Sequence, residues 1–549
     1  MKKIIAWVMV VLVFSSVILT GCKTKENSKS SMTIDTSKER LEDYSDMMEL
    51  SVFFYGWQNP PKSVENTTSK FLKDNFKIDL SKSVWEKDNA QARNKLAMMI
   101  ASGEIPDVII FNSDGGNSKI LSTQLENSGL VIPREELLEK YMPNYTKFAS
   151  TDVLNVWRNS KDKKLYALPS FTISPDKVEE LSVCSLVPTI IRPDILQKAG
   201  VEFKQPKTPD EFYDLLKLFK ELGKDEGIIP IQFGDLWFAD TLLGSMFGRP
   251  AYGVKLDDNE KRLVSQEWQP YYLDYLKFIS KLYRDKLLNQ DMFINKQGMD
   301  GLVERGKVAV TLSAPTLYHQ RKLSESGINI TPVPINIPKA AGVDRVYYQS
   351  VATLGDIPSY ISTKAKDPIR ISKFIDWGYT FDGIIALSLG APVKGENEFY
   401  KENNEYIYDT ELSQKISKGE QKLSLGNWSY FINLPFSVNL IEKYDPKIFA
   451  KNAPGVPDYI KQGQTILKDT LYTDIKYEKY NLEEKGPIEK SKWVDIVNTR
   501  DKNVASIIMN SKSDAEVEAN YNKMMDELKK SGYIDVEKER YTIYKKVNQ

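Results

Sequence analysis

The stretch that decides the fold is NAQARNKLAMMIASGEIPDVIIFNSDGG, residues 89–116. Its first half carries apolar residues at helical spacing and predicts an amphipathic helix over 89–102. Gly103 follows as a left-handed cap that ends this helix. Residues 106–111 have almost no polar alternation, which predicts a strand buried on both faces, and the turn-rich residues 112–116 come directly after it.

Elements of the same kind continue along the chain. A β-rich run at 50–55 precedes the stretch, and the order strand, helix, strand, helix predicts an α/β domain with a mostly parallel sheet. Thr208 and Glu211 predict a helix start with a capping box, with Pro209 in the first turn. Other expected elements are a helix over 269–288, a strand over 308–312, a helix from Pro368, and a helix that begins after Ser513 and ends at Gly532.

Length and composition exclude several classes of protein. A chain of 549 residues exceeds what one hydrophobic core holds, so we expect two large lobes. Basic and acidic residues number 75 each, and this balance argues against a nucleic-acid partner. The single histidine, His319, argues against His-rich metal sites and most nucleophile–His–acid triads. Only Cys22 and Cys184 are present, and we interpret Cys184 as a small core residue.

The N-terminal segment predicts export and anchoring. Lys2 and Lys3 precede an apolar run over 4–19, which at about sixteen residues is short for a spanning helix and typical of a secretory signal. Its end, Leu19-Thr20-Gly21-Cys22, resembles the bacterial lipobox, in which the cysteine thiol receives a diacylglycerol before cleavage. An ordinary signal with a chance cysteine, or an uncleaved anchor, is the alternative. The polar residues that follow, up to 47, are typical of a flexible tether.

Several local patterns occur in the order found in one family. They are LAMMIASGEIPDVI (96–109), GL (129–130), YMPNY (141–145), KKLYALP (163–169), IRPDIL (191–196), PKTPDEF (206–212) and IDW (375–377). Together with the lipobox they resemble the extracellular solute-binding proteins of ABC importers, in particular the large lipoproteins that bind oligosaccharides in Gram-positive bacteria. Many relatives carry a calcium loop after the helix that begins near 209. Here ELGKDEG (221–227) is too short and too poor in oxygen ligands, so we expect no metal.

The resemblance implies a two-lobe α/β architecture, the type II periplasmic-binding-protein-like fold with hinge-connected lobes and extra helices. The expected organisation is a signal peptide at 1–21, a tether at 22–47, an N-terminal lobe from 48–166 plus 308–365, and a C-terminal lobe from 167–307 plus 366–549. Such proteins close on their ligand by a hinge motion.

The ligand site is expected beyond the carboxyl ends of the strands, as in other open α/β sheets. Aromatic faces cover the apolar side of a sugar, and amides or carboxylates pair with its vicinal hydroxyls. The predicted ligand-binding residues are Trp57, Gln58, Asn59, Asn112, Asp114, Asp235, Trp237, Trp377 and Trp428. For each tryptophan the alternative is a packing role, and for Asp114 it is a turn.

The function implied is capture of an oligosaccharide by a monomeric protein that is lipid-anchored through Cys22 on the extracellular face of the cell membrane. Its expected partners are the permease subunits of an ABC importer, and no cofactor or catalytic residue is expected. One alternative is a binding protein for peptides or another polar solute. The other is a surface-anchored carbohydrate-active enzyme, although the sequence lacks Gly-x-Ser-x-Gly, His-Glu-x-x-His and phosphate-loop motifs.

Overall fold

Two buried apolar cores organise the part of the chain that the structure describes. The computed structural model describes residues 38–55, 65–86, 88–111, 117–172, 189–233, 236–293, 299–312, 331–350, 354–418, 420–421, 428, 431, 447, 450–455 and 458–549. The signal peptide, Cys22, Cys184 and His319 therefore lie outside the described residues.

A five-stranded sheet forms the centre of the first core. Its order is β4 (Val84–Glu86), β2 (Val52–Tyr55), β5 (Val108–Phe111), β14 (Leu354–Ile361) and β6 (Leu168–Thr172). The strand β2 runs parallel to β4 and β5, whereas β14 runs antiparallel to β5 and β6. Every residue of β2 and β5 is buried. The predicted buried strand at 106–111 is therefore confirmed, with its first residue at Val108.

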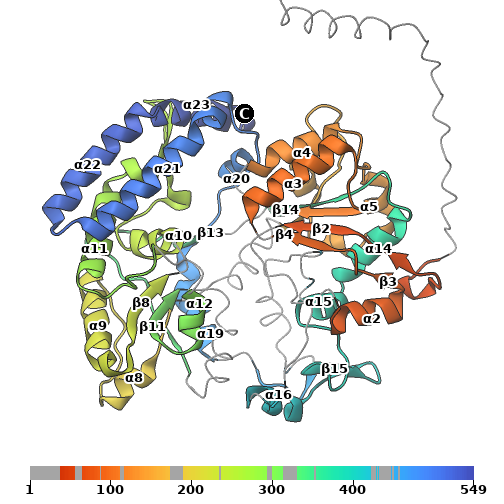
Figure 1. Ribbon diagram of the computed structural model, residues 1–549, viewed down its shortest axis with the longest axis horizontal. Coiled ribbons are helices and arrows are strands. Elements are labelled where there is room, and N and C mark those ends of the chain that lie inside the picture. The colour runs from red at the N-terminus through yellow and green to blue at the C-terminus, as the bar shows by residue number, and fades with distance from the viewer. Residues whose placement is uncertain are drawn as a thin grey trace, which may run out of the picture. The chain divides into compact units, whose positions relative to one another are not determined.

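Helices cover both faces of this sheet. The helix α3 (Asn89–Ser102) begins where the Asp88 carboxylate accepts the Gln91 N–H at 2.8 Å, and it ends at Gly103 with φ 72°, as predicted. Figure 1 shows α3 and α4 on one side of the sheet and α2, α14 and α15 on the other. These helices are α4 (Asn117–Asn127), α2 (Thr67–Phe76), α14 (Pro368–Gly378) and α15 (Phe381–Ser388).

The second core surrounds a four-stranded sheet. Its order is β12 (Val333–Pro334), β7 (Ile190–Ile191), β11 (Val308–Leu312) and β8 (Ile229–Phe233), and only β11 and β8 are parallel to each other. The helices that pack here are α8 (Pro193–Lys198), α9 (Pro209–Leu222), α11 (Pro270–Arg284), α21 (Pro487–Asn510), α22 (Asp514–Lys530) and α23 (Tyr533–Val547).

The start of α9 differs in one detail from the predicted capping box. The Thr208 hydroxyl accepts the Glu211 N–H at 3.2 Å, as expected. The Glu211 carboxylate, however, accepts the N–H of Lys207 at 2.7 Å. The same arrangement recurs at α22, where Ser513 caps the helix and Glu516 accepts the N–H of the residue before it. Both glutamates therefore satisfy the donor one residue outside the predicted box.

The remaining elements are short. They are the turn Leu41–Asp43, β1 (Met48–Glu49), β3 (Ile78–Asp79), α5 (Glu135–Tyr141), α6 (Thr151–Val156), α10 (Leu236–Ala239), β9 (Val254–Asp257), β10 (Arg262–Ser265), α12 (Met299–Glu304), β13 (Gln349–Ser350), β15 (Phe399–Glu402), β16 (Glu405–Tyr408), α16 (Thr410–Ser417), β17 (Ala450–Lys451), α19 (Asp458–Leu467), β18 (Leu471–Tyr472) and α20 (Ile475–Asn481).

Packing differs from the predicted lobe limits at three places. The strand β6 was assigned to the C-terminal lobe with 167–307, yet it pairs with β14 in the first sheet. The strand β11 was assigned to the N-terminal lobe with 308–365, yet it pairs with β7 and β8 in the second sheet. The residues from α14 to β17 were assigned to the C-terminal lobe with 366–549, yet most buried side chains of α14 and α15, together with Tyr406, Trp428 and Ala450, belong to the first core. The physical reason is β14, which returns the chain to the first sheet so that the next helices pack there. The limits of the lobes themselves stay a prediction.

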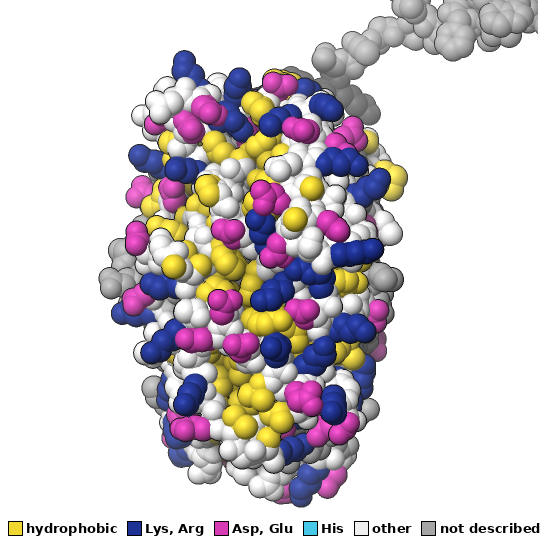
Figure 2. All heavy atoms as spheres, turned by 90° about the vertical axis from the view of Figure 1, so that its left-hand side faces the viewer, with side chains coloured by type: hydrophobic (Ala, Val, Ile, Leu, Met, Phe, Trp, Pro, Cys, Tyr) yellow, Lys and Arg dark blue, Asp and Glu magenta, His cyan; other side chains and the backbone are white. Residues whose placement is uncertain are grey.

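The surface mixes both signs of charge. Figure 2 faces the side of the molecule on which α8, α9, α11 and α22 lie in Figure 1, and it shows acidic and basic side chains interspersed around hydrophobic ones. This agrees with the formal net charge of zero. Within the described ranges, no helix is long and apolar enough to cross a membrane.

Candidate functional site

The carboxyl ends of β2 and β5 lie at one edge of the first sheet. The strands are parallel and pair Tyr55 with Phe111, so both end together, where ligands bind in open α/β sheets. The ring of Phe111 stacks on Tyr55 at 5.5 Å between centroids and on Tyr360 of β14 at 5.7 Å. All three side chains are fully buried. The edge is therefore backed by a layer of aromatic rings from three adjacent strands.

Polar contacts hold this layer in place. The Tyr360 hydroxyl donates to Glu126 Oε1 of α4 at 3.2 Å, and Asn159 Nδ2 donates to the other oxygen at 2.9 Å. Burial raises the pKa of Tyr360 well above its ordinary value, and the negative charge of Glu126 adds to the rise. The Tyr360 hydroxyl therefore keeps its proton, and its hydrogen bond to Glu126 holds the ring against Phe111.

The second sheet presents a comparable edge. The strands β8 and β11 are parallel and pair Phe233 with Leu312, so their carboxyl ends also meet. The helix α10 begins three residues after Phe233, and it carries Trp237 with 59% of its surface exposed. The edge of this indole meets the Phe238 ring at 5.0 Å and 77°. Trp237 is therefore an accessible aromatic surface close to the end of a parallel strand.

A buried ion pair supports the residues that follow Trp237. Arg249 Nε donates to Asp240 Oδ2 at 2.7 Å, and both residues are buried. Asp240 opens a π-helical turn (Asp240–Gly244) directly after α10. Burial raises the pKa of Asp240, and the positive charge of Arg249 opposes that rise. The pair fixes the chain just beyond the exposed indole.

The predicted site residues divide into two groups. Trp57, Gln58, Asn59, Asn112, Asp114 and Asp235 lie outside the described residues, as does the lipidation residue Cys22. The strands that precede these site residues end at Tyr55, Phe111 and Phe233, which are described above. Trp237, Trp377 and Trp428 are described, and only Trp237 among these three is strongly exposed.

Trp377 and Trp428 have packing roles in this structure. Trp377 of α14 is half-buried, and its ring contacts Phe76 at 4.7 Å and Phe374 at 6.2 Å. Trp428 has no exposed surface and its Nε1 donates to Asn66 Oδ1 at 3.3 Å. Both tryptophans belong to the first core, although Trp428 was expected in the second lobe. Neither offers a free ring face comparable with that of Trp237.

An aromatic cluster of the first core was missed from the sequence. Trp85 of β4 stacks on Phe54 of β2 at 4.6 Å and 16°, and it contacts Trp428 at 4.8 Å. Phe431 meets Phe54 edge-on at 5.3 Å. Trp85 is followed by Glu86, Lys87 and Asp88, so its local sequence is polar and does not indicate a packed ring. The missing signal was the pairing of β4 with β2, which a local pattern does not contain.

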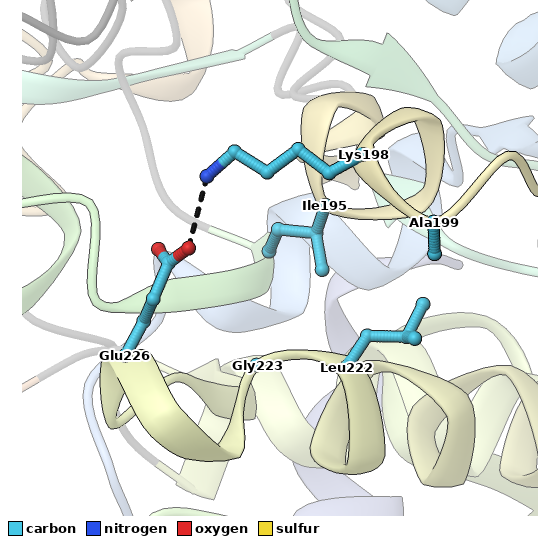
Figure 3. A pocket seen from close by; sticks show the side chains of 6 residues that line it. All are labelled: Ile195, Lys198, Ala199, Leu222, Gly223 and Glu226. Carbon is cyan, nitrogen blue, oxygen red and sulfur yellow. Dashed lines mark hydrogen bonds and ion pairs between the residues drawn. The ribbon is translucent and has the colours of Figure 1, made fainter.

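A small hollow at the other end of β8 is unrelated to this site. It has a volume of about 160 Å³ and lies between α8 and α9. Figure 3 shows Lys198 and Glu226 across its mouth, with their charged atoms 2.9 Å apart. Glu226 precedes the first residue of β8, so the hollow lies near the amino end of that strand. It is also smaller than the roughly 300–1,000 Å³ of ordinary ligand pockets.

The expected absence of a calcium loop concerns residues 221–227. Here Lys224–Glu226 form one 3₁₀ turn, and Glu226 pairs with Lys198. Within the described parts of the chain, no group of three or more His, Cys, Asp or Glu side chains is placed to hold a metal ion.

Each of the two cores contains its own sheet with helices packed against it, and β14 returns the chain from the second core to the first sheet. This arrangement is the two-lobe fold of binding proteins. The family model for bacterial extracellular solute-binding proteins matches residues 71–383, and the chain belongs to this family. It is 23% identical over 492 residues to lipoprotein LipO of Bacillus subtilis, covering 85% of this chain and 88% of LipO.

Other relatives share part of the sequence or the fold. The fructooligosaccharide ABC transporter substrate-binding protein FusA of Streptococcus pneumoniae is 31% identical over 137 residues, which is 25% of this chain and 24% of FusA. The structure of FusA with kestose has a TM-score of 0.59 and 18% identity, covering 91% of this chain and 100% of that one. The N-glycan transport protein NgtS of S. pneumoniae with Man5GlcNAc has a TM-score of 0.54 and 15% identity, covering 90% and 97%. These structures confirm the two-lobe fold.

Proposed function

We propose that this solute-binding protein captures an oligosaccharide in a cleft between its lobes and delivers it to the permease subunits of an ABC importer. It acts as a monomer, anchored through a lipid on Cys22 at the extracellular face of the membrane, and it performs no chemistry on its ligand. The observation that carries the proposal is the exposed indole of Trp237, two residues from the carboxyl-end loop of β8. The oligosaccharide ligands of FusA and NgtS support the substrate class.

The chemistry assigns a role to each predicted residue. Trp237 and Trp57 cover apolar faces of sugar rings, where an aromatic ring replaces water at low entropic cost. Gln58, Asn59 and Asn112 have amides that both donate to and accept from vicinal hydroxyls. Asp114 and Asp235 accept two hydroxyls at once. We no longer assign Trp377 and Trp428 to the residues that contact the sugar, because their rings pack inside the first core.

Thermal unfolding of a soluble chain that begins at Lys38 tests the substrate class. The ligands are kestose, nystose and Man5GlcNAc, with monosaccharides, amino acids and short peptides for comparison. A ligand present at one hundred times its dissociation constant stabilises by about 2.7 kcal/mol, which raises the unfolding midpoint measurably. We expect a rise with one family of oligosaccharides, and we expect mass spectrometry to recover that sugar intact.

The other outcomes decide between the alternatives. A rise only with peptides or amino acids assigns the protein to another polar solute. A shortened sugar in the recovered material assigns it to the carbohydrate-active enzymes. If none of these ligands raises the midpoint, the oligosaccharide proposal fails.

The anchor needs a separate test in whole cells. A chain with Cys22→Ala should lose incorporation of a labelled fatty acid and should no longer fractionate with the membrane. Retention at the membrane without the label would show that the N-terminal segment is an uncleaved anchor.

A further inference from the structure

The chain passes from the second core to the first within a few residues of Leu354. The preceding strand β13 (Gln349–Ser350) pairs with β18 (Leu471–Tyr472), and β18 lies next to side chains of the second core. Leu354 then opens β14, which lies between β5 and β6 in the first sheet. Leu354 is therefore the first residue of the first sheet that follows this crossing.

Side chains hold both hydrogen-bonding groups of Leu354. Trp157 Nε1 of the first core donates to the Leu354 carbonyl oxygen at 2.7 Å. The Leu354 N–H donates to Glu478 Oε2 at 3.0 Å. Glu478 belongs to α20, whose Tyr480 packs against Tyr544 of α23 in a cluster separate from the first core, while Leu482 at the end of α20 packs against the first core. Glu478 thus ties the start of β14 to the C-terminal helices.

The Glu478 carboxylate is buried, and both of its oxygens accept hydrogen bonds. Its exposed fraction is 8%, and its second oxygen accepts the Thr473 hydroxyl at 2.9 Å and the Tyr252 hydroxyl at 3.2 Å. Hydrogen bonds to a carboxylate that water does not reach are stronger than those between neutral groups. The hydrogen bond to Leu354 therefore belongs to a buried network that also includes the Thr473 and Tyr252 hydroxyls.

Tyr252, which donates to this carboxylate, is itself held in an unusual conformation. Its φ of 57° and ψ of 8° lie in the left-handed region, which is unfavourable for a residue other than glycine. The surroundings impose it: the Tyr252 ring stacks on Tyr477 at 4.4 Å, and its N–H donates to the Tyr472 hydroxyl at 3.2 Å. Strain of this kind persists where several contacts determine one geometry, and it is common at hinges and switches.

We propose that Glu478 is a positioning residue for the crossing at Leu354: its carboxylate limits the range of arrangements that the two cores adopt. This inference rests on the proposed function, in which the arrangement of the lobes governs capture of the solute. Without Glu478, the Leu354 N–H loses its acceptor and Tyr252 loses a contact that supports its strained backbone. The cores then sample a wider range of arrangements, because the crossing keeps only its covalent link and the remaining contacts.

Distance measurements by electron paramagnetic resonance test the proposal without any ligand. Cysteines at Met98 of α3 and Asp214 of α9, both exposed, carry spin labels in a Cys184→Ser chain that begins at Lys38. The parent should give one narrow distribution. Glu478→Ala should widen it about twofold and shift its mean. Glu478→Gln should restore the parent distribution, because its amide oxygen can accept the Leu354 N–H while its NH₂ donates to the two hydroxyls.

Control variants separate positioning from stability. Glu489→Ala removes another buried carboxylate from the C-terminal helices, where Arg540 donates to it at 2.8 Å. It should lower the unfolding midpoint and leave the distance distribution unchanged. If Glu478→Ala does not fold, Glu478→Asp replaces it: this side chain keeps the charge but falls one methylene short of Leu354, and it should widen the distribution too.

Two results would overturn the inference. One is a parent-like distribution in Glu478→Ala or Glu478→Asp together with a lowered midpoint, which is a purely structural role. The other is a widened distribution in Glu489→Ala of equal size. Failure of every sugar to bind leaves these distances unaffected, so the proposed function and the role of Glu478 fail separately.

Discussion

The guanidinium of Arg370 lies 4.3 Å from the centre of the Tyr44 ring. The same side chain, 1% exposed, donates to the carbonyl oxygens of Phe76 at 2.7 Å and Lys77 at 3.0 Å. Leu41 belongs to the first core, and Tyr44 is buried beneath the Arg370 guanidinium. Residues 40–46 were expected to belong to the flexible tether, but Arg370 joins them to α2 and β3. The folded part therefore begins earlier than the sequence indicated.

A chain that begins at Met47 should accordingly be less stable than one that begins at Lys38. It loses the burial of Leu41 and Tyr44 and exposes the cation of Arg370, which together correspond to about 2–5 kcal/mol of the free energy of unfolding. Urea denaturation of the two chains measures the difference. Glu39→Ala in the longer chain is the control, because this side chain is exposed and should change nothing. Equal stability of the two chains would contradict a docked segment.

The tryptophans should separate into ligand-binding and packing residues. Trp237→Ala should lower the affinity for the sugar that binds by about tenfold or more, because truncating a stacked aromatic costs about 1–3 kcal/mol. The free energy of unfolding should change by less than about 0.5 kcal/mol, since the side chain is 59% exposed. Isothermal titration and urea denaturation of the same variant measure the two effects.

Trp428→Ala is the matched comparison. This fully buried indole fills the cluster with Phe54 and Trp85, so its loss should cost about 3–5 kcal/mol of stability. Its effect on sugar affinity should be small in the fraction that remains folded. A Trp428→Ala chain of unchanged stability would show that the cluster does not support the first core.

Local signals in the sequence located the helices well. The predicted caps at Gly103 and Thr208 depend on residues within one turn of each other, so a single sequence contains the information. The lobe limits depend instead on strand pairings between distant segments. The strand β11 pairs with β8 and β7, which lie 79 and 119 residues earlier in the chain, and β14 pairs with β5, 251 residues earlier. No local pattern specifies which sheet receives these strands or the helices that follow β14.

In the predicted site, too, the sequence located features that depend on neighbouring residues and missed those that depend on distant segments. The sequence located the strand ends at Tyr55 and Phe111 correctly, whereas it did not predict the strand that ends at Phe233. The exposure of each tryptophan was beyond a single sequence, because it depends on what packs against the ring. Trp428 and Trp237 were both predicted to bind the ligand, yet the ring of Trp428 is covered by Phe54 and Trp85.

Gly383 should tolerate no side chain. It lies in the first turn of α15, and its N–H donates to the Thr380 hydroxyl that caps the helix at 3.1 Å. A Cβ at this position would overlap the Trp377 carbonyl oxygen at the end of α14. Gly383→Ala should therefore lower the free energy of unfolding by more than about 3 kcal/mol, because the overlap is with backbone and the two helices must separate.

Gly227→Ala provides the comparison for Gly383→Ala. Its φ is 66°, but nothing lies within 4 Å of an added Cβ, so only the cost of the left-handed conformation applies, about 1 kcal/mol. Guanidinium chloride denaturation of both variants measures the difference. Equal losses would show that α14 and α15 can move apart at little cost.

Lys485 should make the stability depend on pH. Its ammonium lies 5.1 Å from the centre of the Tyr480 ring, and burial lowers its pKa from the ordinary 10.5 to about 8, although the nearby Glu489 charge opposes this. Between these two pH values the unfolded chain binds a proton that the folded chain does not. The free energy of unfolding therefore rises with pH through this window, and the full penalty of the buried charge applies below pH 8.

The variant Lys485→Met keeps the apolar stem and removes the charge. It should raise the free energy of unfolding at pH 7 by up to about 3 kcal/mol, since one pKa unit corresponds to about 1.4 kcal/mol. Because the parent recovers most of this penalty as its own lysine loses the proton, the advantage should shrink at pH 9.5. Thermal unfolding of parent and variant at both pH values measures it. Lys490→Met, at an exposed position of α21, controls for the loss of one positive charge. A gain for Lys485→Met of the same size at both pH values, or a loss at pH 7, would show that the folded protein stabilises the Lys485 charge.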